Sequence, residues 1–161
     1  MTKEFKYKSI AVGGTFDHIH KGHRALLKRA FETAHKVYIG ITSDDYVKTS
    51  GKTIQHDFET RKTHVQNYLE KEYPMREFEI TKLEKSFGPG MFTKDIEAIA
   101  VSSETSPRVP EANEKRRELG LLDLKIEVVP MILAKDKNRI SSTRIRSGEI
   151  DVEGNLLPKS H

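Results

Sequence analysis

The sequence contains no cysteine and no tryptophan among its 161 residues. Without cysteine the protein cannot form a disulfide, bind a metal through thiolates or use a thiol nucleophile. Long apolar runs are also missing, since none approaches the length that crosses a bilayer, and no secretory signal pattern opens the chain. We therefore expect a soluble cytoplasmic protein that has no membrane partner.

The charge balance is modestly basic, with a formal net charge of +4 and an isoelectric point near 9.2. Lysine and arginine are spread along the chain rather than gathered in one run, so we expect no nucleic acid partner. A phosphorylated small ligand fits the same charge. The length suits one domain over residues 1–161 that is large enough to bury a core.

Strand patterns and helix patterns alternate along the chain. Residues 9–13 and 36–42 are apolar and strand-like, and residues 21–34 between them have one apolar face. This βαβ unit predicts two parallel strands with a right-handed crossover. The whole pattern predicts an α/β fold with a single, doubly wound parallel sheet and helices on both faces. Further expected segments are a loop at 43–56, a helix at 57–72, strands at 76–83, 96–101 and 124–131, a loop at 87–90 with a short helix into Asp95, a loop at 102–110, a helix at 110–119, a short helix from 141 to about 148 and a polar tail from about 150.

The densest group of polar side chains lies between the first strand and the first helix, in residues 13–23. In open α/β sheets, ligands bind at this carboxyl end of a strand, and the free N–H groups of a helix start favour an anion. His20 and His23 are three residues apart, so both can face one ligand, and Gly22 allows a close approach. Two alternatives are surface histidines and a metal site with Asp17 as third ligand. We rank phosphate contact above both.

A second motif, Ile140-Ser-Ser-Thr-Arg-Ile-Arg146, lies near the carboxyl end. Hydroxyl groups at a helix start can donate to phosphate oxygens beside the free backbone N–H groups, and Arg146 follows about one turn later. Ordinary N-capping by Ser141 or Ser142 explains the same pattern. The two motifs together are much more specific than either one alone.

The motifs Gly13-Gly-Thr-Phe-Asp17, His20-Lys-Gly-His23 and Ile140–Arg146 resemble the signatures of the nucleotidylyltransferase superfamily. Their order, their spacing and the chain length are similar to the phosphopantetheine adenylyltransferase family, in its archaeal and eukaryotic-like branch. The resemblance implies a Rossmann-like fold of the HUP type. It also implies AMP transfer from ATP to 4′-phosphopantetheine, which gives dephospho-coenzyme A and pyrophosphate by in-line attack without a covalent intermediate.

The resemblance also implies roles for individual residues. Mg²⁺ should bridge the ATP phosphates, and no all-protein metal site is expected. Thr15 should contact both ATP and the acceptor phosphate, and the backbone of Phe16 should lie near ATP. The catalytic pair His20 and His23 should bind the ATP phosphates, with His23 stabilising charge at the α-phosphorus. The β- and γ-phosphates should contact Ser141, Ser142, Thr143 and Arg146.

Other residues are expected near the substrates on weaker grounds. Lys48 is the candidate for the acceptor phosphate, and Lys52 is the second candidate. The loop after residues 96–101 should lie near the nucleotide. The candidates in this loop are Ser103, Glu104 and Thr105. On the following helix, Asn113 and Arg116 could face the site. The alternative is that this charged side of the helix is exposed to solvent.

Two rival functions and one misleading motif remain. Another small nucleotidylyltransferase, such as a glycerol-phosphate cytidylyltransferase or an FAD synthetase, shares the first motif, but residues 137–143 favour the adenylyltransferase. A non-catalytic RNA-binding relative of the class I tRNA synthetases shares the His-x-Gly-His pattern, but the chain has no basic stripe.

Residues 50–53 resemble the end of a P-loop, yet Tyr46 occupies the position of its required first glycine.

Overall fold

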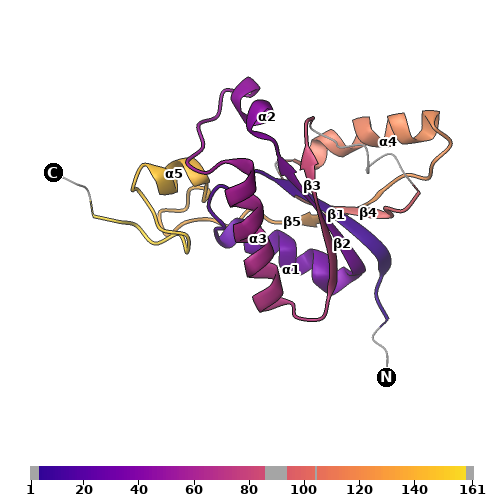
Figure 1. The fold of residues 1–161 in the computed structure, drawn as a ribbon, viewed down its shortest axis with the longest axis horizontal. Helices are drawn as coiled ribbons and strands as arrows, with labels where there is room; N and C mark the ends of the chain where they lie inside the picture. The colour runs from indigo at the N-terminus through magenta and orange to yellow at the C-terminus, as the bar shows by residue number, and fades with distance from the viewer. Residues whose placement is uncertain (1–3, 86–93, 104, 159–161) are drawn as a thin grey trace.

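A five-stranded, fully parallel sheet forms the centre of the protein in the computed structural model, which describes residues 4–85, 94–103 and 105–158 (Figure 1). The strand order β3-β2-β1-β4-β5 reverses direction between β1 and β4. At such a switch point the loops leave in opposite directions and open a crevice at the carboxyl ends of the strands. The strands are β1 (Tyr7–Gly14), β2 (Ala34–Thr42), β3 (Glu77–Leu83), β4 (Ala98–Ser102) and β5 (Lys125–Val129).

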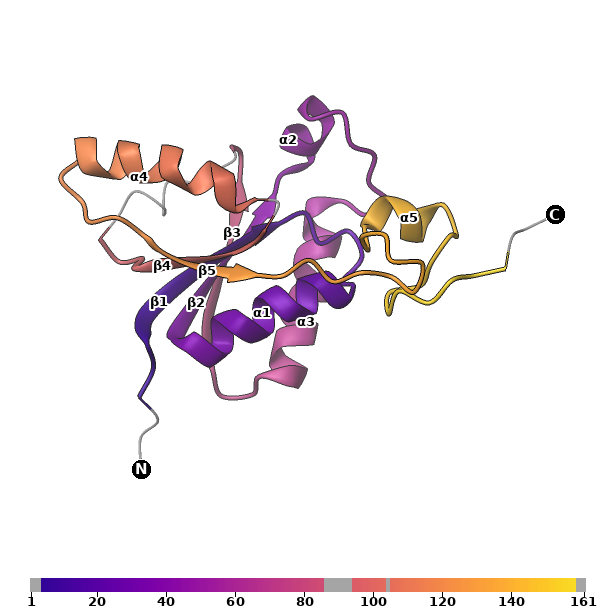
Figure 2. The same cartoon turned by 180° about the vertical axis from the view of Figure 1, so that it is seen from behind.

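The helices cover the two faces of the sheet unequally. Both views place α1 (Lys21–Thr33) and α3 (Phe58–Glu72) on one face and α4 (Val109–Glu118) on the other (Figures 1 and 2). The larger core cluster packs under α1 and α3, whereas the smaller one joins β4 to α4. The predicted doubly wound sheet is therefore confirmed, with one face more fully covered than the other.

The alternating pattern of the sequence predicted most elements correctly. The first two strands, α1, α3 and α4 lie within a few residues of their expected bounds, and β3 lies at an edge of the sheet as its alternating pattern indicates. The loop expected at 87–90 lies outside the described residues, as does most of the segment before Asp95. Among the described residues, no helix has the length and apolarity that a membrane span requires.

One expected loop contains a helix. Residues 44–49 form α2 (Asp44–Thr49), which begins where the Ser43 side chain accepts a hydrogen bond from the Tyr46 N–H. Asp44 and Asp45 lie in the first turn, where their charge is favourable. At six residues the helix is too short to show an apolar period, so periodicity could not reveal it.

The expected polar tail from about residue 150 is wrong for residues 150–157. Ile150 is fully buried in a small third cluster with Ala134 and Ile140. An antiparallel bridge links Ile150 to Leu156, and the Lys21 N–H donates to the Val152 carbonyl at 2.9 Å. This segment therefore packs against the start of α1.

Candidate active site

The turn after β1 is held in an uncommon backbone conformation. Phe16 has a φ of 55°, and its side chain is fully buried beside His23, with ring centroids 4.7 Å apart. A left-handed conformation at a non-glycine residue is unfavourable, and such residues gather at functional sites. Burial of the ring stabilises this conformation. It also agrees with the expectation that Phe16 approaches a ligand through its backbone, because its ring belongs to the core.

His20 and His23 form a stacked pair at the start of α1, with ring centroids 3.8 Å apart. His20 is the N-cap, and its Nδ1 accepts from the N–H of Gly22 at 3.1 Å. A Cβ atom on Gly22 would approach the His20 ring to 2.9 Å. The glycine between the histidines therefore leaves room for the ring of His20.

Hydrogen bonds assign the neutral tautomers of the two rings. Since Nδ1 of His20 accepts, its proton lies on Nε2 and is available as a donor. Nδ1 of His23 lies 2.9 Å from the His18 carbonyl, where it donates, and its longer 3.4 Å contact with the His20 N–H is then only a close approach. Burial, with neighbouring charges, lowers the pKa of His20 to about 4 and that of His23 to about 3. Both rings are therefore uncharged at pH 7 before a ligand binds.

Asp17 joins the first motif to the last one. Its carboxylate is 1% exposed and accepts from Arg146 Nη1 at 2.6 Å and from the backbone N–H groups of Gln55 and His56. Burial alone would raise the pKa of Asp17, but the Gln55, Arg146 and His56 hydrogen bonds outweigh it and lower the pKa. The two motifs, 129 residues apart at this contact, therefore meet in the fold.

The same carboxylate belongs to a possible metal cluster. Asp17, His18 and His56 have potential ligand atoms within 4.8 Å of one another. Arg146 and three backbone or ring N–H groups already contact the carboxylate oxygens, so a cation would have to displace them. The cluster also differs from the alternative weighed above, because it does not contain His20 or His23.

Arg61 is a second buried charge beneath the site and was missed by the sequence reasoning. Its guanidinium is 0% exposed, and Nη1 donates to the carbonyls of Thr15 and Thr42 at 2.9 and 2.8 Å. Nη2 bonds the carboxylate of Asp44 at 2.7 Å. Arg61 thereby ties the ends of β1 and β2 to α2. It also fixes Thr15, whose hydroxyl accepts from the Thr42 hydroxyl at 3.1 Å.

The late motif forms α5 (Ser142–Arg146), with Ser141 as its N-cap, accepting from the Arg144 N–H at 3.2 Å. The capping alternative is therefore correct for Ser141. Thr143 accepts from Arg146 Nη2 at 3.2 Å, so its hydroxyl lies beside the Arg146 guanidinium that contacts Asp17.

A polar pocket of about 310 Å³ opens beside the histidine pair. Lys52, Arg108 and Arg139 give it three cationic side chains, and its described lining contains no carboxylate. The remaining described lining consists of His20, Gly22, His23, Leu26, Ser102, Thr105, Val129, Pro130, Met131, Ile132 and Ile140.

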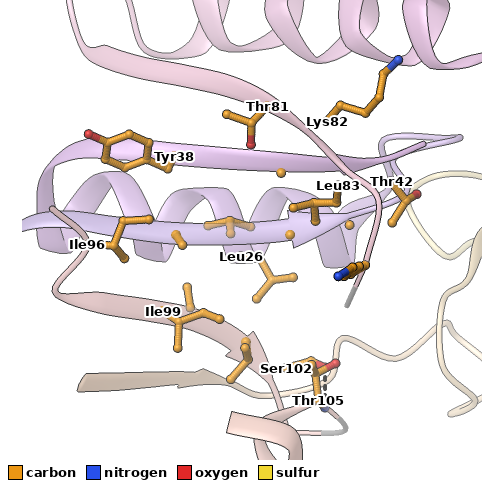
Figure 3. Close-up of a pocket in the computed structure, with 18 of the residues that line it drawn as sticks. Leu26, Tyr38, Thr42, Thr81, Lys82, Leu83, Ile96, Ile99, Ser102 and Thr105 are labelled. Atoms are coloured by element: carbon orange, nitrogen blue, oxygen red, sulfur yellow. Dashed lines mark hydrogen bonds between the residues drawn. The ribbon is translucent and has the colours of Figure 1, made fainter. Parts of the chain in front are cut away.

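An apolar pocket of about 440 Å³ adjoins it (Figure 3). It lies between β2 and β3 on one side and β4 on the other, with residues 11–14 of β1 also in its lining. Leu83 packs against Gly40 so closely that a Cβ there would lie 2.7 Å from it. Leu26, Ser102 and Thr105 line both pockets, so the two cavities lie next to each other.

Some predicted residues do not line either pocket. Lys48 lies exposed on α2, whereas Lys52, the second candidate, lines the polar pocket. Thr105 is in both linings, Ser103 is exposed and in neither, and Glu104 lies outside the described residues. Like Ser103, the late-motif residues Ser141, Ser142 and Thr143 are absent from the described linings.

Asn113 and Arg116 do not face the site. Asn113 is buried, and its Oδ1 accepts from the Leu124 N–H at 2.7 Å. Arg116 is also buried and donates to the Leu122 carbonyl at 2.8 Å. Both side chains form hydrogen bonds with the backbone of the segment that leads into β5. Buried polar groups need such partners. The many charged residues of α4 hide this structural role in the sequence.

The fold and the paired motifs define a nucleotidyltransferase, and residues 11–148 match the cytidylyltransferase-like family model. Phosphopantetheine adenylyltransferase of Methanopyrus kandleri is 40% identical over 151 residues, covering 94% of this chain and 96% of that protein. The same enzyme of Pyrococcus abyssi is 42% identical over 155 residues, covering 96% and 98%. The chain belongs to the cytidylyltransferase-like family and, within it, to the phosphopantetheine adenylyltransferases.

Solved structures agree on the fold. A protein of unknown function from Archaeoglobus fulgidus has a TM-score of 0.67 and 31% identity, covering 75% of this chain and 88% of that chain. Tyrosyl-tRNA synthetase from the same organism also has a TM-score of 0.67, at 10% identity over 94% of this chain and 61% of its own. At that identity the second likeness concerns the fold alone.

Proposed function

We propose that the protein transfers AMP from ATP to 4′-phosphopantetheine and releases dephospho-coenzyme A and pyrophosphate. The observation that carries this proposal is the pair of adjacent pockets, one cationic beside the two histidines and one apolar. The cationic pocket suits a polyphosphate, and the apolar pocket suits the uncharged arm of the acceptor. The two relatives named above are called phosphopantetheine adenylyltransferases, which is the name for an enzyme that catalyses this reaction.

The chemistry needs no nucleophile from the protein. An oxygen of the acceptor phosphate attacks the α-phosphorus of ATP, and the bond from that phosphorus to the bridging oxygen breaks. Its electron pair leaves with pyrophosphate. The attacking phosphate is already an anion, so no general base is needed. What the protein must supply is alignment and charge stabilisation between two anions.

Several residues in and near the polar pocket are assigned roles in this reaction. His20 presents an Nε2–H donor without carrying charge, and a phosphate near Nε2 of His23 raises the pKa of that ring and favours its protonation. Thr15 bonds the hydroxyl of Thr42, which lines the apolar pocket, and Lys52 lines the polar pocket, and we propose both as contacts of the acceptor phosphate. Lys52 replaces Lys48 as the proposed acceptor-phosphate ligand, whereas Ser142, Thr143 and Arg146 remain proposed contacts of the β- and γ-phosphates.

Magnesium enters this scheme with the nucleotide. The described lining of both pockets offers no carboxylate, and the oxygens of Asp17 already accept hydrogen bonds. The described residues at the two pockets therefore offer Mg²⁺ no free carboxylate, and we propose that the metal enters with the nucleotide as MgATP. The substrates are water-soluble, so we expect the reaction in the cytoplasm and without a nucleic acid partner.

The proposal is tested by incubating the purified protein with MgATP and 4′-phosphopantetheine. We expect pyrophosphate release and a product with the mass of dephospho-coenzyme A. Parallel reactions contain MgCTP with glycerol 3-phosphate, or MgATP with FMN, and the His20→Ala variant serves as the inactive control. Release with either alternative pair and none with 4′-phosphopantetheine would assign the protein to a different nucleotidyltransferase activity.

A further inference from the structure

The positive charge of the polar pocket does not come from its histidines. Both imidazoles are neutral at pH 7, because burial lowers the pKa of His20 to about 4 and that of His23 to about 3. Among the described lining residues, charge at that pH belongs to Lys52, Arg108 and Arg139. All three cations lie outside the family motifs at residues 13–17, 20–23 and 140–146.

Arg139 is close enough to act on His20. After burial, its positive charge is the next largest cause of the lowered pKa of His20, ahead of His18 and Arg24. The backbone of Arg139 is fixed by an antiparallel bridge to Leu133, and its carbonyl accepts from Arg144 Nη1 at 2.8 Å. Its position beside Ile140 is therefore set by the structure before α5.

Arg108 reaches the same pocket from a different element. It ends the short 3₁₀ turn η2 (Ser106–Arg108) that leads from β4 into α4, and its N–H donates to the Thr105 carbonyl at 3.0 Å. Within the described parts of the chain, no acidic side chain pairs with it. One arginine thus approaches from the turn after β4 and the other from the loop before α5.

We propose that Arg108 and Arg139 together bind the β- and γ-phosphates of the nucleotide and retain the pyrophosphate as it leaves. The inference deepens the proposed function and rests on it for the identity of the nucleotide. Guanidinium groups bind phosphate oxygens through paired N–H donors and keep their charge when partly desolvated. The imidazoles are neutral before the ligand binds, so the arginines and Lys52 supply the positive charge that the polyphosphate first meets.

The test compares Arg108→Met and Arg139→Met with the wild-type protein by calorimetric titration with MgATP, inorganic pyrophosphate and AMP. One charge-assisted hydrogen bond contributes about 1.5–3 kcal/mol, which corresponds to about a 10- to 100-fold loss of affinity. We expect losses of that size for MgATP and pyrophosphate in both variants. We expect less than about a threefold loss for AMP, because AMP has no terminal phosphates.

Arg117→Met is the matched control, since it removes the same charge from the surface of α4, where Arg117 pairs with Asp123. A second measurement follows the imidazole resonances by NMR. Loss of the Arg139 charge should raise the pKa of His20, whereas Arg117→Met should leave it unchanged. Arg139→Lys, which keeps the charge, should recover most of both effects.

Unchanged pyrophosphate affinity in both methionine variants would overturn the proposal, as would an equal loss for AMP. The outcome is independent of the acceptor. If the wild-type protein bound pyrophosphate through these arginines but made no dephospho-coenzyme A, the proposed reaction would be wrong, whereas the phosphate-binding role of the two arginines would be confirmed. If the reaction proceeded and the variants bound pyrophosphate normally, only the arginine pair would fail.

Discussion

The two pockets at the carboxyl edge of the sheet differ in the chemistry of their linings and in what supports them. The polar pocket combines cations and imidazoles, whereas the apolar pocket is lined mainly by aliphatic residues of β1, β2, β3 and β4. Asp17 ties the first motif to α5, whereas Arg61 bonds the carbonyl of Thr42, which lines the apolar pocket, and ties the strand ends to α2. Each of these two regions is thus organised around one buried charge with several backbone partners.

The difference between the two linings predicts that a mutation can change the binding of one substrate without changing the binding of the other. A change in the polar pocket should affect the nucleotide and the transition state, and a change in the apolar pocket should affect the acceptor. Among the described lining residues, Leu26, Ser102 and Thr105 are the ones that line both pockets, so the other described positions belong to one pocket each. The predictions below depend on that division.

His23→Ala should have the largest effect on activity. Loss of a group that stabilises developing charge typically lowers kcat by about 100- to 1000-fold. ATP affinity should change by less than about tenfold, because the contact is strongest in the transition state. Steady-state kinetics and calorimetric titration with ATP measure the two quantities. His35→Ala, an exposed site at the start of β2, is the control, and equal losses in kcat and ATP affinity would contradict the assigned role.

Asp17→Asn tests the support of the polar side. Removing one partner of a buried charge pair destabilises a protein by about 3 kcal/mol or more, and Arg146 would lose its partner. Asp44→Asn is the matched change on the other side. Arg61 keeps the Thr15 and Thr42 carbonyls as acceptors, and water can replace the half-exposed Asp44 at its guanidinium, so the loss should be smaller than that of Asp17→Asn. Urea unfolding measures both, and equal losses would show that the two supports do not differ.

The sequence predicted the meeting of the two motifs but not these supports. The strand, helix and motif patterns are local, so they can be recognised without tertiary information. Arg61 lies on the inward side of α3 with Phe58 and Val65, at helical spacing, yet an arginine among apolar residues reads as a surface residue. Its burial is explained by partners from other segments, namely the carbonyls of Thr15, Thr42 and His56 and the carboxylate of Asp44.

The segment 150–157 was missed for a related reason. Its apolar residues are few and separated by polar ones, so no period marks them, and its stability comes from docking on distant parts of the chain. Ile150 packs with Ala134 and Ile140, and Glu153 forms an ion pair with Arg24 of α1. Such contacts appear only when the tertiary fold is known.

The pH dependence of stability should reveal the neutral histidines. The pKa of His20 is about 4 in the folded protein against 6.5 for the free side chain, so the unfolded chain takes up a proton first as the pH falls. The free energy of unfolding should therefore decrease between pH 6.5 and pH 4, by roughly 3 kcal/mol from His20 alone. The His20→Asn variant keeps an N-cap side chain but has no ring to titrate, so its free energy of unfolding should decrease less over this pH range. If the curves of the variant and the wild type ran parallel, the lowered pKa of His20 would be refuted.

The smallest effect is expected in the apolar pocket. Leu83→Asn exchanges an aliphatic wall for an amide, and losing one such contact costs about 1.5 kcal/mol, or about tenfold in the KM of the acceptor. ATP affinity should stay within about twofold of wild type, since Leu83 lines only the apolar pocket. Leu122→Asn makes the same exchange at an exposed position after α4 and should change neither constant. A rise in the Kd of ATP without a rise in the acceptor KM would reverse the assignment of the two pockets, because the apolar wall would then belong to the nucleotide.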